Sequence, residues 1–542
     1  MEELSQHSRE VAKGSFWGLA GQVFFKLFSF FYVVLLARMA SQEDVGLFYL
    51  ALGIVSILSV FSDLGVSGAI LRYIPYFEGK GEHGKIKGLV KMAYLALFAT
   101  ATVIMALLFW QADYVGTLYQ NPRLAAVLRL LSAYILFSNF LRINTFYLQG
   151  MRDIKSSQLY QNIQNGLKLV FTVALFYIYG PSAGMIALAF ILSLAGAVAL
   201  SSAAIYGPVS KIKGAAAGLT RSDLNGIVSI GVMVATIQMF GVIMTSLDRT
   251  LLGYLTPPPG SETAVAVYSI ATALALALSS LSWAVGSVFL PLVSRLAGKQ
   301  DMEGIRSVLA TAQRWCTFMT IPSAVVMMLF AGEMLGAFYG QSYASGAMAM
   351  ALFTLGLAFY SISYMLFLTF IAMRMVGLEL SMTLISGAFN VIMVVLLIPP
   401  FGMEGAAAAG ALGFALSAFL AKHYCEKLIG FRFPPEIYKM VAAGVVTFAL
   451  MFIIKAPLYS TLSALVPFGS SDPYLFKASH LAILGALMMV SVAIFATFAL
   501  LLRCFRKEDV ALMRSVMRKA MVPGPLIGFA EKIAVRGIAE GK

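Results

Sequence analysis

Long apolar segments recur along the whole chain, and they limit the folds that are open to it. Hydrophobic residues make up 60% of the 542 positions and charged residues only 12%, whereas soluble domains average about 45–50% apolar and about 25% charged residues. A membrane-crossing helix needs about 20 apolar residues. The composition therefore excludes a soluble enzyme and a disordered chain, and it predicts an all-α polytopic membrane protein.

We predict fourteen transmembrane helices from these segments, because each is long enough to cross a bilayer. The connections are short, so no soluble domain is expected between them. The first segment is longer than a signal-peptide core and has no cleavage site, so we expect it to remain as a helix. The segments cover residues 15–37, 47–71, 89–110, 124–148, 160–180, 184–206, 226–247, 263–290, 308–330, 346–371, 376–398, 403–421, 438–456 and 478–502.

The positive charges are distributed unequally between the two ends of these segments. Of the 39 Lys and Arg residues, 31 lie at or near one set of alternate ends and five lie on the other side. Cytoplasmic loops carry the excess of Lys and Arg in membrane proteins. The sequence therefore predicts a multi-pass protein of the cell membrane whose N-terminus and C-terminus are both cytoplasmic.

A weak internal repeat appears at an offset of 219 residues. Tyr49 aligns with Tyr268, and Gly79-Lys80 aligns with Gly298-Lys299. Six helices separate the matching segments, so the repeat is parallel, and such repeats place a binding site at their interface. Chance similarity of two helical hairpins is the alternative. The predicted layout is a cytoplasmic segment (1–14), an N-terminal six-helix bundle (15–225), a C-terminal six-helix bundle (226–425), two extra helices (426–502) and a basic cytoplasmic tail (503–542).

The net charge of +14 and the three cysteines carry little functional information. The charge lies in short loops and in the basic tail rather than on a soluble domain, so we expect no nucleic-acid partner. The tail fits either a helix on the anionic inner leaflet or a solvated segment. The cysteines and four histidines lack metal-ligand spacing, so neither a metal site nor a disulfide framework is predicted.

Basic side chains within the apolar segments are the candidate substrate-binding residues, because ionisable groups at membrane depth are costly and often functional. Lys26 shares a helix face with Ser15, Gln22 and Ser29 and is the clearest candidate. For Lys26 the alternative is a side chain that reaches the membrane interface. For Arg142 and Lys168 it is helix packing by polar side chains, and Arg249 could simply be neutralised by the adjacent Asp248. The full set of candidates is Lys26, Arg142, Lys168, Arg249 and Arg314.

Acidic side chains are fewer at this depth, where Asp63 and Glu379 are the candidates. A cavity lined by cations suits an anionic ligand, and phosphate is the natural partner of Lys and Arg. Whether an H⁺ or Na⁺ ion is coupled to transport stays open, with Asp63 and Glu379 as its carriers.

Two stretches of the sequence resemble a known family. They are LLARMASQEDVGLFYLALGIVSILSVFSDLGVSGAILRYIPYFEGKGE at Leu35–Glu82, and LDRTLLGYL followed by AVYSIATAL within Leu247–Leu274. Both are similar to the polysaccharide transporters of the MOP (MATE-like) superfamily, the Wzx-type lipid-linked oligosaccharide flippases. The resemblance implies two helical bundles, alternating access and a polyprenyl-diphosphate sugar substrate.

The expected function is therefore translocation of a polyprenyl-diphosphate-linked oligosaccharide to the outer leaflet, without catalytic residues or a cofactor. Expected partners are the lipid-linked substrate and membrane lipids, with glycosyltransferases and a polymerase acting beside the protein. A MATE-type drug/cation antiporter is the alternative, although such proteins need a core carboxylate where the first segment offers Lys26. A membrane enzyme is less well supported, because the longest outer connection, roughly Lys455–Lys477, contains one acid, Asp472, and no His.

Overall fold

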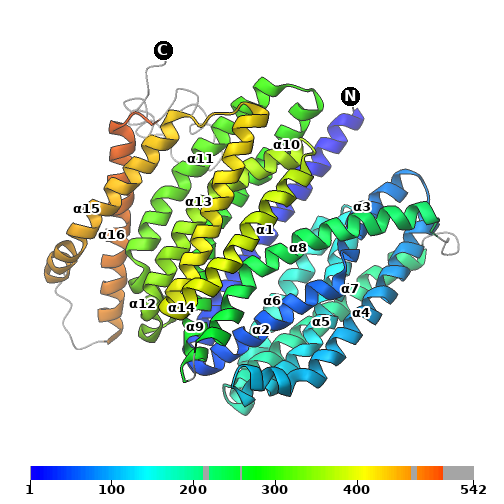
Figure 1. The fold of residues 1–542 in the computed structure, drawn as a ribbon, viewed down its shortest axis with the longest axis horizontal. Coiled ribbons are helices and arrows are strands. Elements are labelled where there is room, and N and C mark those ends of the chain that lie inside the picture. Colours follow the sequence, from blue (N-terminus) through cyan, green and yellow to red (C-terminus); the bar gives the residue numbers. More distant parts are fainter. Residues whose placement is uncertain (1, 212–218, 257–258, 466–472, 505–542) are drawn as a thin grey trace. The chain divides into compact units, whose positions relative to one another are not determined.

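Helices make up the whole regular structure of the described chain. The computed structural model describes residues 2–211, 219–256, 259–465 and 473–504, and within these ranges it contains α-helices α1 to α16, two 3₁₀ helices and no strand (Figure 1). The chain divides into two compact units. The first contains residues 1–270 and 387–409, and the second contains residues 271–386 and 410–542.

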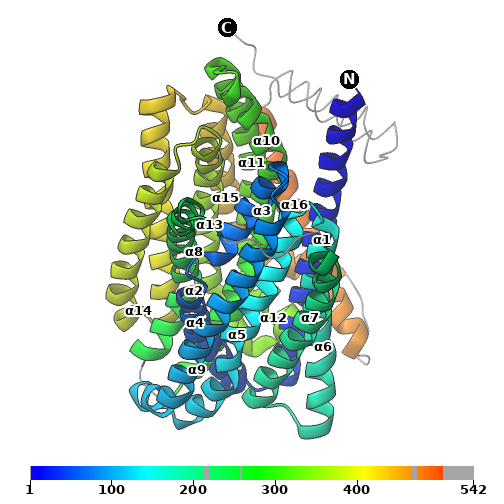
Figure 2. The same cartoon turned by 90° about the vertical axis from the view of Figure 1, so that its right-hand side faces the viewer.

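The first unit is built mainly from the N-terminal helices, and Figure 2 shows α4 to α7 running alongside one another. Several helices begin where the sequence supplies a capping side chain: Ser41, Asn121 and Thr220 each accept a hydrogen bond from a backbone N–H two or three residues later. The helices are α1 (Glu2–Met39), α2 (Gln42–Asp63), α3 (Val66–Gly79), α4 (His83–Leu118), α5 (Pro122–Gly150), α6 (Ile154–Tyr179), α7 (Ala183–Lys211), α8 (Arg221–Leu255) and most of α9 (Ser261–Ala275).

The second unit continues from the end of α9. Its elements are η1 (Leu276–Leu278), α10 (Ser279–Gly298), α11 (Met302–Leu329), α12 (Ala331–Tyr339), η2 (Gln341–Gly346), α13 (Ala347–Ala372), α14 (Val376–Ile429), α15 (Pro435–Leu465) and α16 (Pro473–Leu501). The middle of α14, Gly387–Ala409, belongs to the first unit. Grouping by contact thus places α8 and most of α9 with the N-terminal helices, while the layout predicted from the repeat remains a prediction.

Three breaks interrupt the helices. The first lies within the predicted segment 47–71, the second lies between the predicted segments 376–398 and 403–421, and the third lies at the end of the predicted segment 308–330. Leu64 and Gly65 adopt positive φ values of 47° and 74° between α2 and α3, which lie in one predicted segment. Gly402, at φ 56°, interrupts the 54-residue α14 just after two prolines. A bend of 74° separates α11 from α12. Positive φ and proline both end regular helix, so the first two breaks follow from local chemistry. At the third break, Phe330 leaves helical geometry at φ −111° and ψ 19°.

Fewer than the predicted fourteen helices are both long enough and apolar enough to cross a membrane. Ten helices of the described residues meet this requirement, or eleven if the bent pair α11–α12 is one crossing. All fourteen predicted segments lie on helical residues, but polar helices such as α6 fall below the requirement and α14 counts once despite its break. The protein is an all-helical multi-pass membrane protein, and the count of fourteen stays a prediction.

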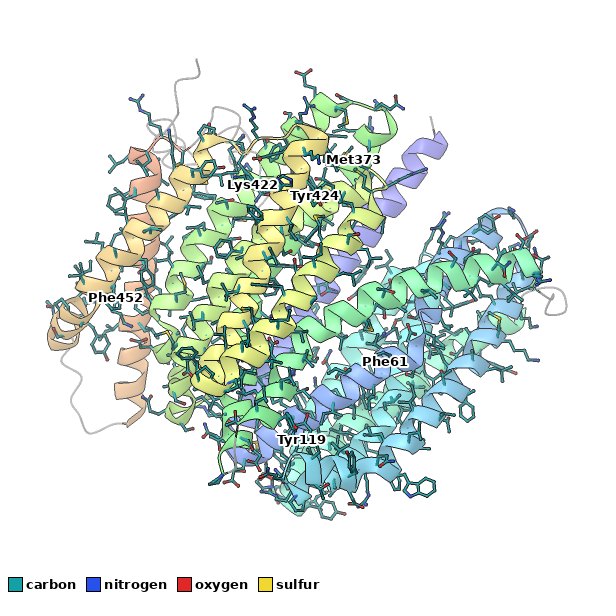
Figure 3. The ribbon with its side chains drawn as sticks, in the orientation of Figure 1. Phe61, Tyr119, Met373, Lys422, Tyr424 and Phe452 are labelled. Carbon is teal, nitrogen blue, oxygen red and sulfur yellow. The ribbon has the colours of Figure 1, made fainter. Side chains whose placement is uncertain are left out.

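Large apolar side chains on the outside of the helices fit contact with lipid. Phe61 on α2 is 49% exposed and Phe452 on α15 is 72% exposed (Figure 3). Such exposure is unusual on a soluble monomer but is expected where hydrocarbon replaces water.

Glycines bring α2 and α3 into direct contact with α8 in the first unit. A Cβ atom at Gly65 would lie 1.7 Å from the carbonyl oxygen of Gly231, and a Cβ at Gly253 would lie 2.6 Å from Leu50. A Cβ at Gly53 would lie 2.6 Å from the hydroxyl oxygen of Thr250. Small residues allow this backbone approach between membrane helices, where dispersion contacts replace the hydrophobic effect.

A lysine on α15 stabilises the bend between α11 and α12 in the second unit. Lys455 Nζ donates to the carbonyl oxygen of Leu329 at 2.6 Å and lies 2.5 Å from Glu333 Oε1. The same ammonium lies 4.9 Å from the centre of the Phe330 ring. The last carbonyls of a helix lack intrahelical partners, so this lysine satisfies one of them where α11 ends.

Candidate functional site

Lys168 is buried among aromatic rings in the first unit. It lies on α6, is 8% exposed, and its Nζ donates to Asn165 Oδ1 at 3.0 Å. The same nitrogen lies 4.2 Å from the centre of the Tyr32 ring on α1 and 5.3 Å from that of Phe190 on α7. Cation–π contacts strengthen when the cation is desolvated, so three helices hold this ammonium away from lipid.

Arg249 occupies a second polar cluster of the first unit, formed by α2, α8 and α9. Its electrostatic neighbours include Tyr49, Asp248 and Tyr268, and the Tyr268 hydroxyl donates to Asp248 Oδ2 at 3.0 Å. Asp248 is 2% exposed. Gly53 on α2 allows the aliphatic part of Arg249 to approach, since a Cβ there would lie 3.2 Å from its Cγ. The two tyrosines that the repeat aligns thus both lie beside one guanidinium.

The two cations are connected through a stacked pair of aromatic rings. Phe190, which contacts Lys168, stacks on Tyr134 with a ring separation of 5.7 Å and an interplanar angle of 11°. Tyr134 is in turn an electrostatic neighbour of Arg249. The first unit therefore brings two of the predicted basic residues to one aromatic cluster, which we define as Tyr32, Tyr134 and Phe190.

Arg142 and Lys26 occupy other positions in the same unit. Arg142 Nη1 donates to Gln238 Oε1 on α8 at 2.8 Å, so it is held by an amide. Lys26 is half-buried. Its helix packs on α6 through a neighbouring face, where Asn162 Nδ2 donates to the carbonyl oxygen of Gly21 at 3.1 Å. Gln22 is exposed, and the side chain of Ser15 lies outside the described residues.

Arg314 lies in the second unit and is only 2% exposed on α11. Its neighbour Gln313 is fully buried on the same helix, as are the hydroxyl groups of Ser282 on α10 and Ser361 on α13, which are 2.9 Å apart. Arg314 is therefore buried within the second unit, whereas the other four basic candidates belong to the first.

The two predicted acidic residues differ in their surroundings. Asp63 is 1% exposed, and its Oδ2 accepts from the Ser67 hydroxyl at 2.8 Å across the break between α2 and α3. This contact gives Asp63 a structural role at the break. Glu379 is half-buried in the first turn of α14, where the helix dipole favours a negative charge. Their roles as ion carriers stay predictions.

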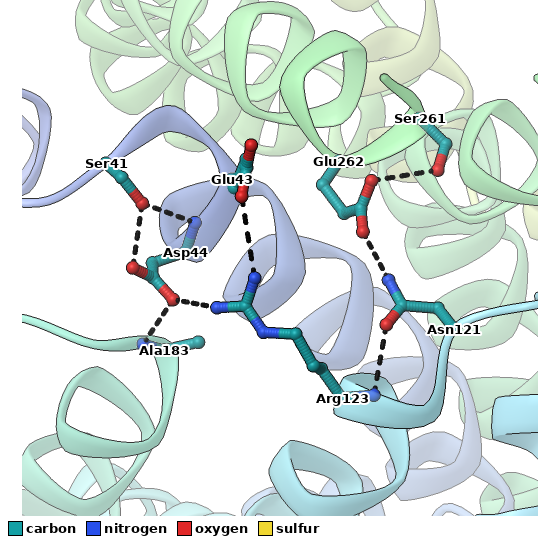
Figure 4. A network of polar contacts seen from close by, with 8 residues as sticks. All are labelled: Ser41, Glu43, Asp44, Asn121, Arg123, Ala183, Ser261 and Glu262. Carbon is teal, nitrogen blue, oxygen red and sulfur yellow. Dashed lines mark hydrogen bonds and ion pairs between the residues drawn. The ribbon is translucent and has the colours of Figure 1, made fainter. Parts of the chain in front are cut away.

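A polar network joins four helix connections of the first unit (Figure 4). Arg123 Nη2 lies 2.7 Å from Asp44 Oδ1, and the same oxygen accepts from the backbone N–H of Ala183 at 3.2 Å. Asn121 donates from its amide to Glu262 at the start of α9. The network therefore connects the α1–α2, α4–α5, α6–α7 and α8–α9 connections.

A second ion pair joins the opposite end of α8 to α4. Lys85 Nζ lies 3.0 Å from Asp223 Oδ2 in the first turn of α8. Hydrogen bonds from the side chain and backbone of Thr220, together with the nearby Lys85, lower the pKa of the Asp223 carboxyl to about 2. Both ends of α8 are thus tied to the N-terminal helices of this unit by polar contacts.

Metal binding finds no support among the described residues. No group of three or more His, Cys, Asp and Glu side chains there could hold a metal ion. Cys316, Cys425 and Cys504 are buried as free thiols. The chemistry of the described polar clusters is thus that of cations, phenols and amides.

The sequence did not indicate the aromatic partners of the cations. Tyr32 and Lys168 are far apart in the chain, and no spacing rule connects a tyrosine on one helix to a lysine on another. The repeat offered one usable signal, because it singled out Tyr49 and Tyr268, which both lie near Arg249.

Comparison with known proteins gives the family. The family model described as "Polysaccharide biosynthesis protein" matches residues 35–348, which is more than half of the chain. The chain belongs to this family. A second model, described as "Lipid II flippase MurJ", matches residues 230–474. Membership of the MOP superfamily, expected from the two sequence stretches, is confirmed.

Individual relatives agree with this membership. The chain is 23% identical over 433 residues to the "Probable low-salt glycan biosynthesis flippase Agl15" of Haloferax volcanii, covering 78% of this chain and 85% of that protein. Its fold is similar to a structure of the lipid II flippase MurJ in an inward closed conformation, with a TM-score of 0.67, 16% identity and coverage of 89% and 98%. An inward-facing MATE transporter matches with a TM-score of 0.60, 15% identity and coverage of 77% and 98%.

Proposed function

We propose that this member of the polysaccharide biosynthesis protein family is a flippase for a polyprenyl-diphosphate-linked oligosaccharide. It moves the sugar-diphosphate head from the cytoplasmic to the outer leaflet by alternating access, while the prenyl chain stays in lipid. The step needs no covalent chemistry. The sugar lipid is made and used by glycosyltransferases and a polymerase in the cell membrane.

The observation that carries this proposal is the pair of basic residues at one aromatic cluster within the helices. Lys168 and Arg249 are both held by side chains of the first unit, and Arg142 lies on a neighbouring helix of the same unit. Guanidinium and ammonium groups are the usual partners of phosphate. A relative named as a probable glycan biosynthesis flippase and a matching family model named for a lipid II flippase support the proposal.

The membrane potential gives the proposed reaction a direction. With the cell interior negative, each negative charge that moves outward gains about 2.3 kcal/mol per 100 mV. A head with two negative charges would gain roughly 4.6 kcal/mol per 100 mV. An H⁺ or Na⁺ ion that couples through Asp63 or Glu379 remains an additional source of energy.

Transport by the purified protein tests the proposal. The protein is reconstituted into vesicles with a fluorescent polyprenyl-diphosphate disaccharide, and accessibility of the sugar to an impermeant glycosidase is followed. We expect faster translocation than in protein-free vesicles, and acceleration by a potential that is negative on the donor side. Efflux of ethidium without any sugar-lipid movement would instead favour the MATE-type drug antiporter.

The orientation in the membrane is part of the proposal and is tested by labelling. We expect a cysteine at Ser182, in the α6–α7 connection, to react with an impermeant maleimide on intact cells. A cysteine at Gly81, between α3 and α4, should react only after permeabilisation. The reason is the excess of Lys and Arg on the Gly81 side of the helices. The native cysteines are buried, so little background labelling is expected. Labelling of the cysteine at position 81 on intact cells would contradict the proposed orientation.

A further inference from the structure

The exposed surface of α10, in the second unit, is divided into two stripes of different chemistry. Val288 is 70% exposed and Leu292 is 44% exposed on one stripe, as expected for contact with lipid. The other stripe follows at helical spacing and carries hydroxyl groups and an indole. Its members are Ser280, Trp283, Ser287 and Ser294.

This second stripe contains no charge, since residues 280–294 include no Asp, Glu, Lys or Arg. Trp283 is 40% exposed, and Ser287 and Ser294 are also exposed. Ser287 Oγ donates to the carbonyl oxygen of Ala284 at 2.8 Å, which leaves its oxygen lone pairs to accept. Accepting oxygens on an exposed helix face gain nothing from hydrocarbon. The stripe therefore fits a surface that meets a polar but uncharged ligand or water.

Aromatic side chains from two further helices adjoin Trp283. Its Nε1 donates to the hydroxyl oxygen of Tyr360 on α13 at 3.2 Å. The Tyr360 ring lies 5.6 Å from that of Tyr364, at 31°, and 5.5 Å from that of Phe414 on α14. Gly286 leaves space for this arrangement, because a Cβ there would lie 2.7 Å from Tyr364 Cε1. Three helices of the second unit thus hold the rings in place.

The combination of ring faces and hydroxyl groups matches the surface of a sugar. A pyranose ring has an apolar face of C–H groups, which stacks on an aromatic ring, and an edge of hydroxyl groups, which need hydrogen-bond partners. The diphosphate of the proposed substrate needs cations, and residues 280–294 provide none. The chemistry of this surface therefore fits the glycan part of the proposed substrate rather than its diphosphate.

We infer that Trp283, Tyr360 and Tyr364 form a stacking platform for a pyranose ring of the transported glycan. The inference rests on the proposed function and makes it more specific, because it assigns a sugar-binding surface to the second unit. The serines of the same stripe on α10 provide hydroxyl groups for the edge of the sugar.

Transport of the fluorescent polyprenyl-diphosphate disaccharide tests the platform. We expect Trp283→Ala to lower the rate about 5- to 10-fold through loss of the stacking contact, while Trp283→Phe keeps most of it. The matched control is Trp110→Ala, since Trp110 is 86% exposed on α4 in the other unit. An unchanged rate for Trp283→Ala, at normal protein level, would overturn the inference.

Fluorescence separates sugar recognition from phosphate recognition. Replacing Trp17, Trp110 and Trp315 by Phe leaves Trp283 as the single tryptophan. We expect its emission to change with the polyprenyl-diphosphate disaccharide and not with polyprenyl diphosphate alone. An equal response to the sugar-free lipid, or a response to ethidium alone, would contradict the inference. Absence of transport by the wild-type protein would instead defeat the proposed function itself.

Discussion

Replacing Arg249 by Met is expected to reduce translocation of the sugar lipid about 10- to 100-fold, because a hydrogen bond to a charged group contributes about 1.5–3 kcal/mol. Arg249→Lys should retain part of the rate, since the charge is kept while the planar, bidentate geometry is lost. The measurement is the initial rate in reconstituted vesicles, normalised to the amount of folded protein recovered by size-exclusion chromatography.

A double variant distinguishes substrate binding from simple charge neutralisation. Asp248 is buried beside Arg249, so Arg249→Met leaves a carboxylate whose charge is less well compensated. If Arg249 serves only to neutralise Asp248, the combination Arg249→Met with Asp248→Asn restores translocation. If Arg249 contacts phosphate, the double variant recovers protein level but remains inactive. We expect the second result.

Lys26→Ala is expected to keep the protein at its normal level in the membrane and to abolish export of the sugar lipid. A lysine at the centre of a membrane helix costs about 2.5–3.5 kcal/mol on insertion scales, so its removal should not weaken insertion. The half-buried position of Lys26, next to the exposed Gln22, fits a side chain that meets water or an anion. Export is measured as surface glycan in cells, with membrane level determined by immunoblotting.

Two further variants make the result for Lys26 specific. Lys26→Arg should retain part of the export, because it keeps the charge but changes reach and geometry. Lys91→Ala removes an exposed lysine near the start of α4 and should leave export unchanged. Full export by Lys26→Ala at normal protein level would refute a role for this lysine in substrate binding.

The positions of the helices followed from the sequence, and so did the break between the predicted segments 376–398 and 403–421, where α14 leaves helical geometry at Gly402. The break at Leu64 and Gly65 did not. Apolar runs of about 20 residues demand backbone hydrogen bonds within the segment, so each predicted segment lies on helix. The break at Leu64 and Gly65 falls inside one such run, because a leucine with positive φ has no signature in composition. The prolines before Gly402 were visible in the sequence, yet both remain within the 54-residue α14, and the departure from helical geometry comes at Gly402.

The sequence predicted which charged residues are buried within the helices, but not which side chains they contact. Burial of Lys168 and Arg314 follows from charged residues within apolar segments. The contact of Lys168 with Tyr32, however, depends on how α1 packs against α6, and that packing involves other residues, such as Gly21 and Asn162. Pairing of Asp248 with Tyr268 likewise joins residues on two helices.

The glycine contacts between α2–α3 and α8 restrict how these helices can move. At Gly65 the carbonyl oxygen of Gly231 occupies the place of a side chain, and at Gly53 the Thr250 hydroxyl does so. If α8 slid by one residue along its neighbour, bulkier groups would meet at these points and the backbones would have to separate. Only one register is therefore compatible with close packing. During a transport cycle, α8 should therefore not slide along α2 and α3, and any rearrangement between these helices has to proceed by their separation.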